Sequence, residues 1–166
     1  MQAWFIQLWG FIGLAIILFA FQKSKRASFL TLFFIGQLFV ILHFSLLGAW
    51  SAVAMNAVAA VRSLLFKKRK TANNALLYAF IVAFWLAGVF TWAGYYSLIL
   101  SLAFTLETLA LWKEDTQNIR YVMLAARPLF FVYNFIVGSV AAMVADGFLF
   151  GSLIVGIVRM RAQKKE

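Results

Sequence analysis

The chain has 166 residues, of which 65% are hydrophobic and 12% are charged, and its formal net charge is +10 at pH 7. A soluble domain of this length cannot bury so much apolar surface, so the composition indicates a membrane protein. Cysteine is absent and histidine occurs once, which excludes thiolate and multi-histidine metal sites, and we expect neither a metal nor a cofactor.

Seven apolar segments follow one another along the chain, each close to the ~17 to 25 residues that cross a bilayer as a helix. The third and fifth segments are near the short limit. We therefore predict an all-α membrane protein with seven transmembrane helices. The segments cover residues 3–21, 28–47, 50–66, 75–92, 96–112, 121–138 and 140–158.

The connectors between these segments alternate in charge. Thirteen of the fifteen basic residues lie in the first, third and fifth connectors and in the C-terminal tail, whereas the second, fourth and sixth connectors have none. By the positive-inside rule, the N-terminus is then outside and the C-terminus is cytoplasmic. Because basic juxtamembrane loops suit anionic lipid head groups, we expect the lipid bilayer as a partner and no nucleic acid.

The chain also resembles itself at an offset of 90 residues. This offset places Gly48 over Gly138, where each glycine permits a tight turn, and Asn56 over Asp146. Span order, loop charge and rare polar positions agree between the two halves, which favours an internal duplication.

The duplication predicts two parallel three-helix repeats joined by a linker helix, a 3+1+3 arrangement. The first repeat covers residues 1–70, the linker helix 71–93, and the second repeat with its basic tail 94–166. Substrate sites in transporters built from repeats lie near the membrane midplane, where the halves meet.

Three stretches carry a resemblance to a known family: His-Phe-Ser-Leu-Leu-Gly at 43–48, the helix at 56–62, and Tyr-Asn-Phe-Ile-Val-Gly-Ser at 133–139. They resemble the YgjV family of bacterial inner-membrane proteins over almost the whole chain. The resemblance implies a multi-pass protein of the bacterial inner (cytoplasmic) membrane and no established substrate. Tyr133 stands where the family pattern has a histidine.

More remotely, the 3+1+3 arrangement is similar to that of the SWEET, PQ-loop and nicotinamide-riboside-transporter superfamily. This similarity implies movement of small solutes through a pocket between two triple-helix bundles. The Pro-Gln pair of the PQ-loop signature is absent from this chain.

Ionisable residues inside the apolar segments are the main functional signal, because an Arg or Asp at the centre of a membrane helix costs at least ~2.5 to 3.5 kcal/mol. Counting from the segment ends at about 1.5 Å per residue places these residues in two layers. The outer layer, roughly 6 to 9 Å deep on that count, is predicted to line a substrate-binding pocket. It holds His43, Asn56, Tyr133, Asn134 and Asp146.

The inner layer holds Arg62, Glu107 and Arg127, with Gln37 a little deeper. We predict that this net positive layer forms a gate or a charge pair, and that its arginines favour anionic or hydroxyl-rich solutes. Pro128 should bend the sixth helix, because it removes a backbone donor and its ring clashes one turn back. That helix is therefore our choice for the moving element.

Each of these residues also has a structural interpretation. Arg62, about one turn from Lys67, can extend its side chain to the cytoplasmic surface, which we favour. Glu107 and Arg127 can form a purely structural ion pair. For His43, a hydrogen bond between helices is the better explanation. Asp146 has no basic residue in its layer, so we expect it to be protonated or hydrated.

The sequence thus supports a small-solute transporter or facilitator, optionally proton-coupled through Asp146 or His43. The alternative is a non-transporting scaffold or assembly subunit whose buried polar residues only fix helix packing. We expect no enzyme, because Asp146 and Glu107 fall in opposite layers, too far apart for a carboxylate dyad. A monomer suffices for transport, and a homodimer through Gly10 and Gly13 is the other option.

Overall fold

The computed structural model describes residues 3–21, 23, 25–68, 74–112 and 116–163, and its regular structure within these ranges is entirely α-helical. Seven helices follow the seven apolar segments, which confirms the predicted all-α fold. They are α1 (Ala3–Phe21), α2 (Arg26–Leu47), α3 (Trp50–Lys68), α4 (Asn74–Phe90), α5 (Tyr96–Trp112), α6 (Thr116–Ile136) and α7 (Val140–Gln163).

The helix ends agree with the predicted segments except at α6 and α7. Helix α6 begins at Thr116, five residues before the predicted start at 121, and α7 continues to Gln163, beyond the predicted end at 158. In both cases the extra turns have polar sequences, which continue a helix without being apolar. Hydropathy therefore marked the apolar part of each helix and missed its polar extension.

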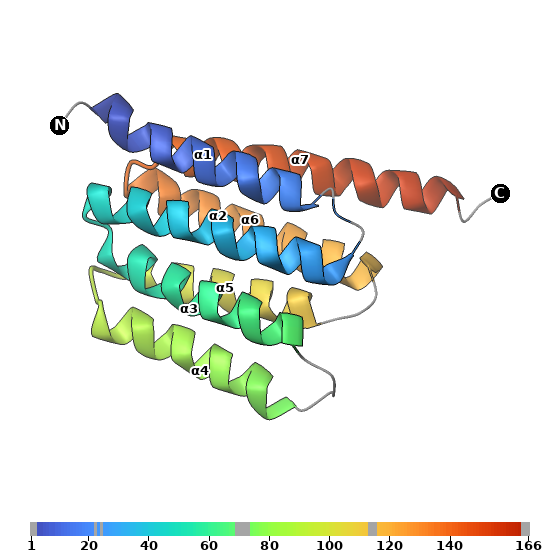
Figure 1. Cartoon of the computed structure of the whole chain (residues 1–166), viewed down its shortest axis with the longest axis horizontal. Helices are drawn as coiled ribbons and strands as arrows, with labels where there is room; N and C mark the ends of the chain where they lie inside the picture. Colours follow the sequence, from blue (N-terminus) through green and yellow to red (C-terminus); the bar gives the residue numbers. More distant parts are fainter. Residues whose placement is uncertain (1–2, 22, 24, 69–73, 113–115, 164–166) are drawn as a thin grey trace.

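The helices form two layers with α4 at one edge (Figure 1). Helices α1, α2 and α3 follow one another in the first layer, and α7, α6 and α5 in the second. The layers meet where α1 packs against α7 and where α3 packs against α5. Six helices thus close into a ring, in which α2 and α6 face each other, and α4 packs outside it against α3 and α5.

The turns after α2 and α6 have the same geometry. Gly48 and Gly138 adopt left-handed backbone conformations with φ of 72° and 71°, which glycine adopts without a side-chain clash. In each turn the residue after the glycine donates its amide hydrogen to the carbonyl five positions earlier, as in a Schellman motif. These bonds join Ala49 to Phe44 at 3.0 Å and Ser139 to Asn134 at 2.9 Å.

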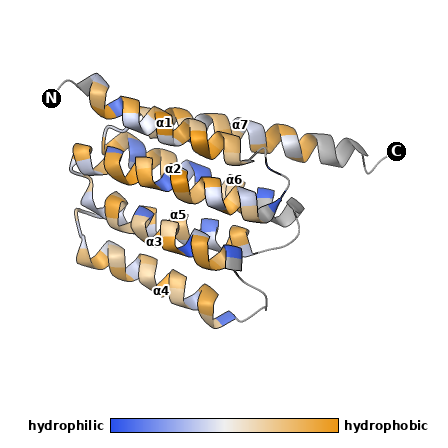
Figure 2. Ribbon diagram, in the orientation of Figure 1, coloured by the Kyte–Doolittle hydropathy of each residue, from blue (hydrophilic) through white to orange (hydrophobic). Residues whose placement is uncertain are grey.

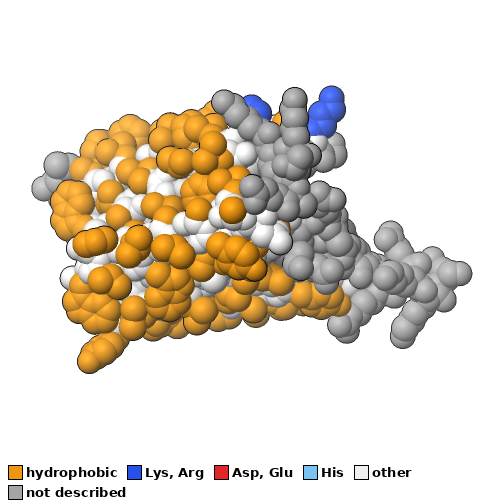
Figure 3. Space-filling view, turned by 90° about the horizontal axis from the view of Figure 1, so that it is seen from below, with side chains coloured by type: hydrophobic (Ala, Val, Ile, Leu, Met, Phe, Trp, Pro, Cys, Tyr) orange, Lys and Arg blue, Asp and Glu red, His pale blue; other side chains and the backbone are white. Residues whose placement is uncertain are grey.

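The outside of the ring is apolar. Hydrophobic residues occupy all faces of most helices (Figure 2), and the face seen from below is largely covered by hydrophobic side chains (Figure 3). Exposed aromatic residues include Phe90, whose side chain is 83% exposed. Helices that are apolar all round suit a membrane.

Two stretches, Ala27–Leu47 and Val140–Val158, are both long and apolar enough to span a membrane by themselves. Trp4–Ala20, Asn74–Phe90 and Tyr96–Trp112 are apolar but shorter.

Gly10 and Gly13 are buried within the chain. A Cβ atom at Gly10 would lie 2.7 Å from the Cβ of Ala141, and one at Gly13 would lie 3.1 Å from the carbonyl oxygen of Gly36. The glycines therefore let α1 approach α7 and α2 closely within one chain, and the choice between a monomer and a homodimer stays open.

Candidate functional site: the central cavity

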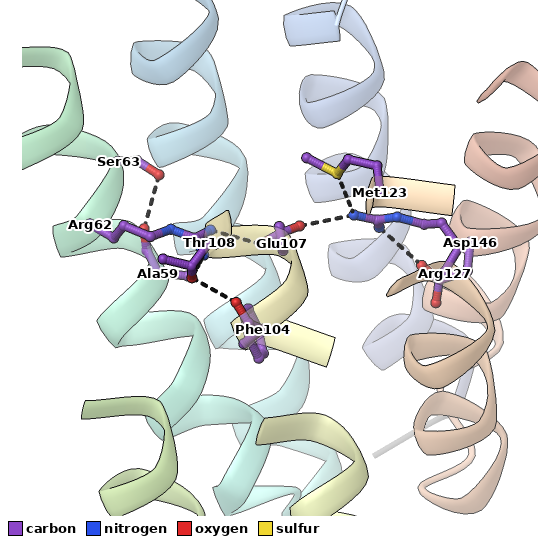
Figure 4. Close-up of polar contacts among 9 residues, drawn as sticks. All are labelled: Ala59, Arg62, Ser63, Phe104, Glu107, Thr108, Met123, Arg127 and Asp146. Carbon is purple, nitrogen blue, oxygen red and sulfur yellow. Dashed lines mark hydrogen bonds and ion pairs between the residues drawn. The ribbon is translucent and has the colours of Figure 1, made fainter. Parts of the chain in front are cut away.

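Two arginines and two carboxylates from four helices meet inside the ring (Figure 4). Glu107 on α5 accepts hydrogen bonds from Arg62 on α3, with Nη2 2.7 Å from Oε2, and from Arg127 on α6, with Nη2 2.9 Å from Oε1. Arg127 also donates through Nη1 to Oδ1 of Asp146 on α7, at 3.2 Å. All four side chains are buried, and their formal charges cancel.

Neutral side chains complete this charged cluster. Arg62 donates to the hydroxyl of Thr108 at 2.6 Å, and the Asn134 amide donates to Oδ2 of Asp146 at 2.7 Å. Each of the four carboxylate oxygens therefore accepts a hydrogen bond from a different donor atom. Such pairing is the condition under which charges are tolerated in a low-dielectric interior. The Nε atoms of Arg62 and Arg127 remain buried without a partner.

The predicted Glu107–Arg127 pair is confirmed. The expectation that Arg62 reaches the cytoplasmic surface is wrong, because its side chain is 0% exposed and points to Glu107. A carboxylate on a neighbouring helix thus outweighs extension toward the surface.

The separation into two layers is also wrong. One guanidinium, that of Arg127, contacts both Glu107 and Asp146, so Asp146 has a basic partner and the carboxylates do not lie in opposite layers. The error comes from counting depth along the backbone, which gives each residue one level and ignores the reach of its side chain. The long side chain of Arg127 reaches both residues.

A cavity of about 90 Å³ lies beside this cluster, lined by side chains from all six helices of the ring. Since one water needs roughly 10 to 15 Å³ by this kind of measure, the cavity holds several waters or a small solute. Four of the five predicted pocket residues line it: His43, Asn56, Asn134 and Asp146. Gln37, Glu107 and Arg127 do so as well.

Tyr133 does not line the cavity. Its buried ring lies between Phe44 and Tyr96, at centroid distances of 6.5 and 5.9 Å, and its side chain hydrogen-bonds the backbone of Ala52. Neighbouring residues in a helix point about 100° apart, so Tyr133 and Asn134 take different directions, and only Asn134 faces the cavity. Tyr133 instead lines a recess of about 510 Å³ at the ends of α2 and α6.

His43 lines the cavity but uses both ring nitrogens to join helices. Nδ1 lies 2.8 Å from the carbonyl oxygen of Ile6 on α1, and Nε2 lies 2.7 Å from the hydroxyl of Ser139 in the turn after α6. Gln7 supports the same junction, because its amide donates to the carbonyl of Gly138 at 3.2 Å. These contacts favour the structural interpretation of His43. Sequence reasoning missed Gln7, although a glutamine in an apolar segment was a signal.

The wall formed by the first half of the chain is mostly apolar and carries no Asp, Glu, Lys or Arg, and its polar residues are Gln37, His43 and Asn56. Gln37 on α2 is 4% exposed, and its Oε1 has no hydrogen-bond partner. Asn56 on α3 donates to the carbonyl of Ala52 at 2.7 Å. Pro128, next to Arg127, lies inside α6 with its ring exposed on the outer surface, and the bend expected there stays a prediction.

A family model described as a bacterial inner membrane protein, Imp-YgjV, matches residues 4–164. No curated protein and no solved structure matches the chain. The more remote similarity to the SWEET and PQ-loop superfamily therefore stays an expectation.

Proposed function

The chain belongs to the Imp-YgjV family of bacterial inner membrane proteins, and we propose that it is a transporter or facilitator that moves a small solute through its central cavity. The observation that carries this proposal is the cavity itself, a space surrounded by six helices that brings seven polar or charged side chains together between helices whose outer faces are apolar. Ionisable residues retained inside a membrane commonly mark substrate or ion pathways.

In this proposal all seven helices cross the membrane, with the N-terminus outside and the C-terminus in the cytoplasm. Helices α1–α3 and α5–α7 form the two repeats, and α4 is the linker helix. The contacts support this layout, because an offset of four helices converts the α1–α7 contact into the α5–α3 contact, and both occur. In addition, α4 contributes none of the described residues that line the cavity.

The cavity lining gives stronger support for the repeats. Sixteen of its twenty lining residues form eight pairs at an offset of 90 residues. Equivalent positions of the two halves therefore face the same space. The pairs are Gly10–Leu100, Leu14–Phe104, Ile17–Glu107, Gln37–Arg127, Val40–Phe130, Phe44–Asn134, Ala52–Ala142 and Asn56–Asp146.

The charges of the cavity favour a polar solute without net charge. Both guanidinium groups are bound to carboxylates, and the four charges cancel, so an anionic solute meets no unpaired positive charge. The opposite wall offers the free amide oxygen of Gln37. A neutral solute that donates a hydrogen bond to this oxygen suits both walls. Of the anionic or hydroxyl-rich solutes expected from the sequence, this favours the hydroxyl-rich ones.

Tyr133 is placed to close the cavity toward the outside. It contacts Phe44 and Ala52, which line the cavity, and it also lines the recess at the ends of α2 and α6. Movement of α6 relative to α2 would displace this ring and join the two spaces, which is the step that alternating access requires.

Single cysteines in the native cysteine-free chain test this proposal. Ala52→Cys and Ala142→Cys place small thiols on equivalent positions of the cavity wall, and Ala103→Cys, fully buried on α5 and outside the lining, is the matched control. We expect a membrane-impermeant thiol reagent to label the first two from both sides, in intact cells and in inverted vesicles, and to spare the control. Complete protection of all three in a folded protein would favour the scaffold alternative.

A further inference from the structure

The buried Arg127–Asp146 ion pair lies between two spaces. On its inner side both residues line the central cavity. On its outer side both residues line a groove of about 340 Å³ between α6 and α7. The same two residues therefore lie between the cavity and the outer surface of the ring. The other groove residues are Pro128, Phe131, Val132, Gly147 and Phe150.

The walls of this groove are apolar and open. Phe131, Val132 and Phe150 are 43%, 44% and 38% exposed. Helix α6 packs against α5 and α7, and α7 packs against α6 and α1, so no further helix among the described residues covers the groove. A Cβ atom at Gly147 would meet nothing within 4 Å. In a membrane protein such a surface faces the hydrocarbon core.

The Arg127–Asp146 contact, which closes the groove, is the longest of the three ion-pair contacts in the charged cluster. Its 3.2 Å distance exceeds the 2.7 and 2.9 Å of the two bonds to Glu107. If it separates, Arg127 keeps Glu107 and Asp146 keeps Asn134, so neither charge is left without a partner. Pro128, the next residue of α6, also removes one backbone hydrogen bond at this level, which eases local movement of the helix.

The same place offers an unused hydrogen-bond donor. Nε of Arg127 is buried and has no hydrogen-bond partner among the described residues, and Arg127 contributes to both the cavity and the groove. A guanidinium N–H bonds best to a carbonyl or carboxylate oxygen. The chemistry therefore selects a molecule with an apolar body for the groove and an acceptor group for Arg127.

We propose that the Arg127–Asp146 pair closes a lateral entrance, through which an acyl-chain amphiphile dissolved in the bilayer places its head group in the central cavity and its chain in the groove. The proposal commits to this occupant because the donor and the apolar walls complement its two parts. It concerns access from the bilayer, and it holds whether or not the cavity also carries a small solute from water.

A photoreactive monoacylglycerol with a diazirine beside its ester carbonyl, a neutral acyl-chain amphiphile with an acceptor group, is dissolved in vesicles that contain the full chain and tests this entrance. We expect crosslinks at Asn134 and Ala145, which line the cavity. Gly147→Phe should fill the groove and reduce these crosslinks several-fold. Gly151→Phe is the matched control, because a Cβ atom there also meets nothing within 4 Å and the residue lies outside the groove; it should leave them unchanged.

The pair Gly147→Leu and Gly151→Leu repeats the comparison with smaller side chains, and thermal unfolding in detergent checks that each variant is folded. Crosslinks at Phe131 and Phe150 without any at Ala145 would overturn the proposal, since they report lipid on the surface only. It would also be overturned if Gly147→Phe left the crosslinks at Asn134 and Ala145 unchanged. The same holds if a second copy of the chain covered the groove, so that no crosslinks formed at Phe131 and Phe150. The thiol labelling of Ala52→Cys and Ala142→Cys reports separately on the aqueous cavity, so failure of one proposal is distinguishable from failure of the other.

Discussion

Gln37 on α2 and Arg127 on α6, 90 residues apart in the chain, face the same cavity from opposite helices. Gln37 is uncharged and its Oε1 has no partner, whereas Arg127 binds two carboxylates. The cavity therefore has one wall with a free polar group and one wall whose charges are already paired. A solute bound there gains most from the uncharged wall.

Replacing Gln37 with leucine should make the cavity less accessible to water without destabilising the protein. Because the change removes a buried oxygen without a protein partner, we expect the free energy of unfolding in detergent to stay the same or to rise by about 1 kcal/mol. The more apolar cavity should hold less water, so thiol labelling of Ala142→Cys should slow in the same background. A large loss of stability would show instead that the amide has an essential structural partner.

Replacing Glu107 with glutamine should destabilise the protein strongly. The change leaves Arg62 without its carboxylate partner and weakens the bonds to Arg127, and breaking one side of a buried ion pair costs about 3 to 5 kcal/mol. Leu102→Ala, on the exposed face of the same helix, is the control for α5. Thermal unfolding of both variants measures the difference, and equal melting temperatures for the native chain and Glu107→Gln would contradict the network.

The effects of substitutions within the charged cluster on stability should not add up. Arg62→Met combined with Glu107→Gln removes both members of one pair, so the double variant should lose less stability than the sum of the two single changes. Coupling energies of contacting residues are about 0.5 to 3 kcal/mol. A coupling energy of zero would mean that Arg62 and Glu107 do not interact in the membrane.

His43 should behave as a packing residue. His43→Phe keeps a ring but removes the bonds to Ile6 and Ser139, and we expect it to lower the free energy of unfolding by about 1 to 3 kcal/mol. Ser139→Ala on top of it should cost less than Ser139→Ala alone, because the shared hydrogen bond is already lost and only the bond from the Ala142 amide to the Ser139 hydroxyl is removed. Full additivity of the two changes would argue against this bond.

Gly10 should tolerate no side chain. Gly10→Ala forces a methyl group against Ala141 and the His43 ring, and such overpacking typically costs about 1 to 3 kcal/mol. Gly151→Ala is the matched control, because its Cβ atom enters open space. If both variants unfold at the native temperature, α1 does not pack on α7 as described.

The helices and their turns could be predicted because the signals are local. Apolar runs have the length of a helix, and Gly48 and Gly138 each end one with a left-handed residue. The polar first turns of α6 could not be found this way, since hydropathy falls where the helix continues.

The partners of the buried charges could not be predicted, because they depend on how helices rotate against one another. Arg62 and Glu107 are bonded across α3 and α5, helices that are far apart in sequence, and nothing local distinguishes this pairing from a side chain extended to the surface. The pocket was predicted better, because polar residues in apolar helices tend to turn inward. Tyr133 was the exception, since its apolar ring belongs to the packed core beside Phe44 and Tyr96.

The central claim is that the protein alternates between two conformations, and distances between its two halves test this most directly. Spin labels on Trp50→Cys with Val140→Cys report on one end of α3 and α7, and labels on Leu65→Cys with Val155→Cys report on the other end. All four side chains are exposed, and each pair occupies equivalent positions of the two halves. For a transporter with alternating access we expect two distance populations at each end in lipid vesicles, with matching fractions. One narrow distance at both ends would contradict this account and indicate a static scaffold.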